Sequence, residues 1–177
     1  RKSLETVATH RHSAHFIRPA YGSYCFAHLP DTLLNLFGLQ AATPLPADVL
    51  PITGEYDQVI LILADALGWR FLEGKLDRYA FLKEVLANGV LSQLTAQFPS
   101  TTSAHVTCIN SGLPVGESGI FEWFYYEPDA DAVITPLLYA MATSRERESL
   151  RGMGIRANQT LPAPRLIPAL NSAGVQV

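Results

Sequence analysis

Hydroxyl residues gather where a strand-like run of the sequence gives way to a helix-like run. Ser100, Thr101, Thr102 and Ser103 stand there, directly after Pro99. A hydroxyl at a helix N-terminus lies beside unpaired backbone N–H groups and the positive end of the helix dipole, and both favour an anion. The pattern indicates either a nucleophilic hydroxyl that faces a phosphoryl group or a set of ordinary helix caps.

A carboxylate, Asp65, directly follows the apolar run 59–64. A carboxylate at the end of a buried strand is costly unless it is paired or bound to a metal, although Asp65 alone is equally consistent with a cap of the next helix. Strand ends joined by one crossover lie at the same edge of a parallel sheet. We therefore expect the oxygens of Asp65 and Thr102 to lie within reach of one shared cation.

The regular elements that would position these residues follow from hydrophobic patterning. The apolar run 58–64 predicts a strand buried on both faces, and 90–97 predicts the next strand. Between them, 68–86 predicts one or two helices, which makes a parallel βαβ unit. Further helices are predicted at 31–38, 102–111, 134–142 and 166–173. The fold class is α/β, with an open, mainly parallel sheet flanked by helices.

The chain divides into two parts by composition. Residues 1–50 are predicted to be an irregular arm with one short helix that packs on the domain, and 51–177 form that domain. Residues 174–177 look like a helix stop followed by the start of another strand, and a sheet cut short there would leave an unpaired edge. We interpret 51–177 as the N-terminal part of a longer α/β domain.

Composition excludes several classes of protein. The 177 residues are 48% hydrophobic and 16% charged, which is enough for a folded core. The formal net charge of −3 and the lack of a Lys/Arg run argue against a basic nucleic-acid stripe. Two cysteines do not make a disulfide scaffold. With no apolar signal core and no membrane-length apolar run, we expect a soluble chain and favour the cytoplasm; the oligomeric state is not predicted.

Four segments, taken in order, resemble a known family. They are Asp65 after its apolar run, Phe-Pro-Ser-Thr-Thr at 98–102, Ser-Gly-Leu-Pro at 111–114 and Gly-Glu-Ser-Gly-Ile at 116–120. The pattern is similar to the alkaline phosphatase superfamily, above all its type I phosphodiesterase and nucleotide pyrophosphatase branch. In that family a Thr or Ser hydroxyl attacks phosphorus between two metal ions, commonly zinc, and a strand-end Asp binds one of them.

The resemblance implies a role for each matched residue. Thr102, three residues after Pro99, would be the catalytic nucleophile and a metal ligand, and Asp65 a second metal ligand. Thr101 is its nearest competitor, because the residues alone do not rank adjacent hydroxyls. The implied cofactor is a divalent metal, zinc by preference, with two ions in the complete family site. The implied substrate is a small phosphoester.

The sequence departs from the family pattern at several positions. Ser111 and Ser118 replace a Thr and a His that are common there. Glu122 and Trp123 lie where nucleotide pyrophosphatases place an Asn beside the phosphoryl oxygen, which makes both candidate substrate-binding residues. A carboxylate there would repel a phosphate unless it is neutralised. Alternatively, Glu122 points outward while the aromatic residues around it form a core or a pocket wall.

The family also needs further Asp and His ligands downstream, and no histidine follows His105. The two-metal site is therefore not completed here in the family's manner. The cluster of His10, His12 and His15 offers nitrogen ligands if it folds back, although a polar arm is the simpler interpretation. His105 either approaches the site or is a buried helix histidine.

Function follows as a hypothesis from these observations. We expect a metal-dependent phosphoester hydrolase of the phosphodiesterase or nucleotide pyrophosphatase type, acting through a threonine nucleophile. One alternative is a truncated or degenerate module of the same fold without hydrolytic activity. Another is a related phosphonate, phosphomonoester or sulfate ester hydrolase, of which the sulfatase is the weakest because the Cys-x-Pro-x-Arg motif is absent.

Overall fold

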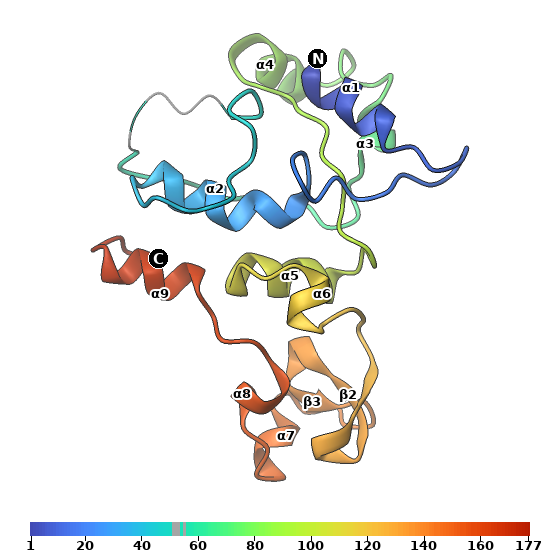
Figure 1. The fold of residues 1–177 in the computed structure, drawn as a ribbon, viewed down its shortest axis with the longest axis vertical. Helices are drawn as coiled ribbons and strands as arrows, with labels where there is room; N and C mark the ends of the chain where they lie inside the picture. The colour runs from blue at the N-terminus through green and yellow to red at the C-terminus, as the bar shows by residue number, and fades with distance from the viewer. Residues whose placement is uncertain (51–53, 55) are drawn as a thin grey trace.

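The computed structural model describes residues 1–50, 54 and 56–177. In chain order its elements are α1 (Lys2–Thr9), the 3-10 helix η1 (Phe26–His28), α2 (Leu29–Leu36), α3 (Trp69–Leu72), α4 (Ala80–Asn88), α5 (Thr102–Ser111), α6 (Val115–Ser118), β1 (Tyr125–Glu127), η2 (Pro128–Ala130), β2 (Ala132–Thr135), η3 (Pro136–Leu138), β3 (Ala140–Met141), α7 (Ser149–Gly152), α8 (Ala157–Thr160) and α9 (Leu166–Ser172). Figure 1 shows α1 to α4 at one end of the molecule, the sheet with α7 and α8 at the other, and α5, α6 and α9 between them.

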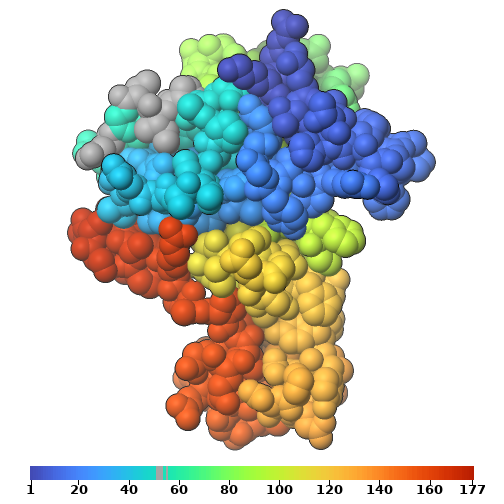
Figure 2. Space-filling model, viewed as in Figure 1, coloured from blue at the N-terminus to red at the C-terminus, as the bar shows by residue number. Residues whose placement is uncertain are grey.

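The sheet is small and antiparallel, in the order β1-β2-β3. Tyr125 pairs with Ile134 across β1 and β2, and Thr135 pairs with Ala140 across β2 and β3. Ile134 and Leu150, which follows the sheet, are completely buried and form the centre of a local core. In Figure 2 this part of the chain, coloured orange, makes the narrower end of the molecule.

The open parallel sheet expected from the sequence is not confirmed. Residues 58–64 and 90–97 form no strand. Among the described residues, the one bridge made by either segment is an isolated parallel bridge from Thr95 to Cys25. Ile60 and Ile62 are 78% and 82% exposed. A strand needs a continued series of hydrogen bonds to a neighbouring strand, and within the described residues only Thr95 of these segments makes such bonds, to Tyr24 and Phe26. The molecule is therefore α/β in content, with helices around a short antiparallel sheet.

Two other local expectations were wrong. The helix predicted at 134–142 is replaced by β2, η3 and β3: Tyr139 takes a left-handed conformation with φ 50° that ends η3 after three residues, and residues on either side pair as antiparallel strands. Residues 175–177 do not form a strand. Conversely, the irregular arm contains α1, which buries Ser3 and Val7 on one face.

The remaining helix predictions are confirmed. α5 spans the predicted range 102–111, α3 and α4 form within or close to 68–86, and α9 occupies most of 166–173. The helix predicted at 31–38 forms as α2, two residues earlier at each end. None of the helices in the described part of the chain has the length and apolar character needed to span a bilayer.

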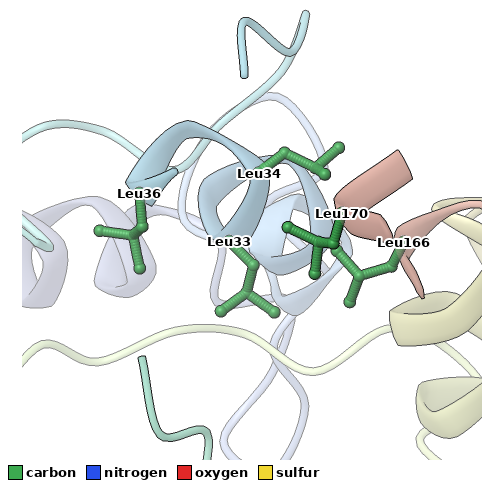
Figure 3. Close-up of a cluster of buried hydrophobic side chains, with 5 residues drawn as sticks. All are labelled: Leu33, Leu34, Leu36, Leu166 and Leu170. Atoms are coloured by element: carbon green, nitrogen blue, oxygen red, sulfur yellow. The ribbon is translucent and has the colours of Figure 1, made fainter. Parts of the chain in front are cut away.

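A leucine core joins α2 to α9, two helices far apart in the sequence. Figure 3 shows leucine side chains of the two helices close together; they are Leu33, Leu34, Leu36, Leu166 and Leu170. An ion pair lies beside this core, where Arg165 Nη1 is 2.8 Å from Asp31 Oδ1. α5 contacts both α2 and α9, so this core supports the helix that carries the hydroxyl cluster.

The pKa of Asp31 leads to a prediction about pH. Burial alone would raise this pKa, but hydrogen bonds from the Thr43 N–H and hydroxyl, together with the Arg165 guanidinium, outweigh burial and hold it below its ordinary value. A carboxylate whose pKa is lower in the folded state stabilises the fold above its unfolded pKa, and this contribution is lost as pH falls through the folded value.

We therefore expect the free energy of unfolding to decrease as the pH falls below about 4, with Asp31→Asn destabilised at neutral pH and less sensitive to acid. Urea unfolding across the acid range measures this dependence, with Asp77→Asn, an exposed carboxylate, as the control. Equal pH dependence in the wild type and Asp31→Asn would contradict it.

Candidate active site

The N-terminus of α5 is built by Thr101. Its Oγ1 accepts a hydrogen bond from the Ala104 N–H at 3.3 Å, which makes Thr101 the helix N-cap. The same hydroxyl donates to the carbonyl oxygen of Phe121 at 3.0 Å. The Thr101 hydroxyl therefore has two structural partners.

The neighbouring hydroxyl, Thr102, faces a carboxylate instead. Thr102 Oγ1 donates to Asp65, at 3.1 Å from Oδ2 and 3.3 Å from Oδ1. The expected proximity of these two side chains is thus present. It is produced by a turn that meets the start of a helix rather than by the edge of a parallel sheet, since Asp65 lies in the turn before Ala66, whose φ is 59°, and Thr102 is the first residue of α5.

Asp65 and Thr102 line one pocket with a volume of about 320 Å³. Its walls are mainly apolar side chains and small residues, among them Phe26, Leu63 and Val106. Thr101 contributes to the same pocket. The pocket therefore combines an apolar lining with one carboxylate and adjacent hydroxyls, as expected of a site that orients a small polar substrate.

Backbone groups add positive potential to this pocket. α5 has ten residues, and the first amides of a helix, here those of Thr102 and Ser103, have no intrahelical acceptor. The helix dipole points its positive end in the same direction. An anionic group held beside Thr102 would therefore meet favourable electrostatics from the helix.

Comparison with known proteins matches the region that contains Asp65 and Thr102. Residues 59–140 match the family model of type I phosphodiesterase / nucleotide pyrophosphatase. The match contains Asp65, Thr102 and the segments from which the resemblance was inferred, and it confirms that resemblance. No curated protein and no solved structure gave a match.

The Ser-Gly-Leu-Pro segment of the phosphodiesterase-like region ends α5. Gly112 adopts the left-handed conformation with φ 74°, and its N–H donates to the Cys108 carbonyl. A Cβ at Gly112 would lie 2.7 Å from Arg165 Nη1. Glycine is therefore required here both for its backbone angle and for the close approach of Arg165.

We expect Gly112→Ala to lower the free energy of unfolding by about 1 to 2 kcal/mol, because alanine is strained in this conformation. Displacement of Arg165 from Asp31 would add to that loss. Gly116→Ala is the matched control, since nothing lies within 4 Å of its Cβ position. Urea unfolding decides the prediction, and equal stability of the two variants would contradict it.

Both ring nitrogens of His105 form hydrogen bonds with backbone groups. Its Nδ1 lies 2.8 Å from the Thr101 carbonyl oxygen, and its Nε2 accepts from the Gln97 N–H at 3.1 Å. The ring lines the pocket and meets Phe26 edge to face, with centroids 4.4 Å apart. The side chain is half-buried and does approach the site, as one of the two interpretations has it, but both ring nitrogens bond backbone groups and neither is free to bind a metal in this arrangement.

Glu122 and Trp123 lie just after Phe121, the residue that contacts Thr101. Glu122 Oε1 accepts from the Trp123 N–H at 2.7 Å, so this carboxylate turns back on its own backbone. Neither residue lines the Asp65–Thr102 pocket. Phe121 stacks on Tyr125 with ring centroids 5.6 Å apart, which fits an aromatic wall at this position. A substrate-binding role for Glu122 and Trp123 remains a prediction.

The metal-ligand set is small in the part of the chain that the structure describes. There, no group of three or more His, Cys, Asp or Glu side chains is placed to hold a metal ion. The Asp65 carboxylate and the Thr102 hydroxyl are oxygen donors of the kind that divalent cations bind, so they fit part of a metal site. Further ligands would have to come from outside the described residues or from solvent.

The N-terminal histidines do not supply those ligands in this structure. His10 Nδ1 bonds the Thr6 carbonyl oxygen at 3.0 Å, and His12 Nδ1 accepts from Arg18 at 2.9 Å. His15 lines a different pocket, together with Arg70. The polar-arm interpretation of this cluster therefore agrees with the contacts.

One residue that supports the site was missed by sequence reasoning. Gln97 is only 2% exposed, donates its N–H to His105 and accepts the Val115 N–H at its Oε1 at 2.9 Å. A polar amide within the strand-like run 90–97 was the available signal. Its Oε1 holds Val115 whereas its Nε2 has no hydrogen-bond partner, so the side chain links the segment just before the hydroxyl cluster to the start of α6 through one bond.

Proposed function

We propose that this chain is a metal-dependent phosphoester hydrolase of the phosphodiesterase or nucleotide pyrophosphatase type, with Thr102 as its nucleophile. The observation that carries the proposal is the hydrogen bond from the Thr102 hydroxyl to Asp65, at the N-terminus of α5 and inside a pocket. The match of residues 59–140 to the phosphodiesterase family supports it.

The proposed reaction has two displacements at phosphorus. In the first, Thr102 Oγ1 forms a bond to phosphorus, its proton passes to the Asp65 carboxylate or to solvent, and the ester oxygen of the leaving group departs and gains a proton. In the second, water attacks the phosphothreonine, the bond to Oγ1 breaks, and the threonine hydroxyl is restored. The products are an alcohol and a phosphomonoester.

In this scheme, each part of the site orients the nucleophile or stabilises the negative charge that develops during the reaction. Asp65 holds the Thr102 hydroxyl in place and accepts its hydrogen bond. The first amides of α5 face the developing negative charge of the phosphoryl oxygens. A zinc ion, bound by Asp65 and Thr102 together with ligands from elsewhere, would lower the pKa of the hydroxyl and neutralise charge on the leaving oxygen.

The substrate is proposed to be a small phosphoester. The pocket volume of about 320 Å³ suits a phosphoryl group with a compact substituent. We place Glu122 and Trp123 at the substrate's outer part, because they follow Phe121, whose carbonyl is tied to Thr101. The exposed Trp123 ring offers apolar contact there.

Turnover of bis(p-nitrophenyl) phosphate by the homogeneous chain, with zinc and with chelator, tests the proposal. We expect slow, zinc-dependent hydrolysis, because catalytic zinc sites use about three protein ligands and only two, Asp65 and Thr102, are proposed here. Hydrolysis at the same rate with excess chelator would contradict metal dependence. Fast turnover that vanishes in His10→Ala/His12→Ala would show instead that the arm completes the site.

A second candidate is an inactive module of the same family, and the small ligand set of the described residues favours it. The two candidates differ in metal binding. A cation that binds only the folded state raises its thermal midpoint. No rise with zinc, less than one bound metal per chain and no turnover would together favour the inactive module.

A further inference from the structure

The His105 side chain connects the two ends of the loop 98–100, which leads into α5. A carbonyl oxygen only accepts hydrogen bonds, so the contact to Thr101 O places a proton on Nδ1. The Gln97 N–H donates to Nε2, so Nε2 carries none. The ring is therefore a single neutral tautomer, protonated at Nδ1. It connects Gln97, which precedes the loop, to Thr101, which follows it.

Both ends of this connection are anchored independently. Gln97 is buried and accepts the Val115 N–H through its side-chain oxygen. The Thr101 hydroxyl bonds the Phe121 carbonyl oxygen. Phe26 packs edge to face on the His105 ring. The imidazole thus spans two fixed points and restricts the intervening residues 98–100.

The connection acts directly on the peptide group before Thr102. The Thr101 carbonyl oxygen accepts both the His105 N–H at 3.1 Å and the His105 ring nitrogen at 2.8 Å. This carbonyl shares a planar peptide with the Thr102 N–H, so fixing one orients the other. The direction of the Thr102 side chain depends on that plane.

We propose that His105 is a positioning residue that holds the Thr102 hydroxyl toward Asp65. Its importance for turnover rests on the proposed function, whereas its effect on the Thr102 side chain does not. An apolar side chain would fill the same space but leave the Gln97 N–H without its acceptor, and the loop would then sample other conformations.

NMR tests the tautomer first. Long-range 1H–15N correlation of the His105 ring is expected to show a protonated Nδ1 and an unprotonated Nε2. The opposite tautomer, or rapid exchange between the two, would overturn the proposal, because the ring would then not join Gln97 to Thr101.

The Thr102 side chain provides the second readout. Three-bond couplings are expected to show a single χ1 rotamer of Thr102 in the wild type and averaging in His105→Leu. His105→Asn, whose amide can still donate to the Thr101 carbonyl, should retain more of the single rotamer. Gln97 amide exchange should rise about fivefold in His105→Leu, as expected for loss of one hydrogen bond.

Asn110→Ala is the matched control. Asn110 also lies on α5 and also bonds a backbone carbonyl one turn earlier, that of Val106 at 2.9 Å, but it does not touch the loop. It should leave the Thr102 rotamer and Gln97 exchange unchanged. A fixed Thr102 rotamer in folded His105→Leu would overturn the proposal, and His105→Asn keeps the comparison available if the leucine variant does not fold.

Kinetics with bis(p-nitrophenyl) phosphate separate positioning from binding. We expect His105→Leu to lower kcat about tenfold or more with little change in KM. We expect His105→Asn to have a kcat between those of His105→Leu and the wild type. A rise in KM at unchanged kcat would contradict a positioning role. Absence of turnover in the wild type would count against the proposed function, while the rotamer measurements would still decide the role of His105.

Discussion

Thr102→Ala is expected to reduce phosphodiester hydrolysis to the uncatalysed rate, while Thr101→Ala retains most of the activity per folded molecule. A methyl group cannot attack phosphorus, so losing the nucleophile removes the covalent route. Thr101 caps α5 and bonds Phe121, and its replacement should lower stability by ~1 kcal/mol instead. The measurement is metal-dependent release of p-nitrophenolate, with helix content followed by circular dichroism.

Serine variants provide the matched controls for this pair. Thr102→Ser keeps a hydroxyl at the attacking position and should keep measurable turnover, and Thr101→Ser keeps the cap and should restore stability. Equal loss of activity in Thr101→Ala and Thr102→Ala, with folding intact, would mean that the structural distinction between the two hydroxyls has no catalytic meaning.

Asp65→Asn is expected to have the second large effect. Asparagine has nearly the same shape and can still accept a hydrogen bond from Thr102, but it lacks the charge that attracts a cation. We expect metal-dependent turnover to fall by about a hundredfold or more, since loss of even an outer partner of a metal site costs 10- to 100-fold.

Metal binding by Asp65 can also be measured without activity. Substoichiometric Mn²⁺ should broaden the NMR signals around Asp65 and Thr102 first in the wild type and much less in Asp65→Asn. Asp57→Asn, an exposed carboxylate eight positions earlier, is the control and should behave as the wild type. Broadening centred on the N-terminal histidines would contradict the assignment of Asp65 as a ligand.

Local signals explain what could be predicted from the sequence. α5 was predictable because hydroxyl residues mark its start and Gly112 marks its end, and both features act within a few residues. The proximity of Asp65 and Thr102 was expected from strand topology and lies within the family match. That expectation held although the parallel strands behind it do not form.

Long-range pairing explains what could not be predicted. The run 58–64 has the composition of a buried strand, but burial requires neighbouring strands, and no local pattern shows whether they are present. The role of His105 was undecidable for a similar reason: one of its partners, Gln97, lies outside α5, and the geometry that joins them arises only in the folded loop. The segment 134–142 shows the same limit, because its apolar content suits a helix as well as strands and the pairing of β2 with β3 decides between them.

The most direct test of the central claim is to locate the phosphoryl group on the protein. The chain is mixed with bis(p-nitrophenyl) phosphate and zinc, quenched in acid within the first turnover and digested for mass spectrometry. The account predicts a phosphorylated threonine at position 102, absent from Thr102→Ala and present in Thr101→Ala. Phosphate on Ser100 or Thr101, or hydrolysis without any labelled protein, would contradict it.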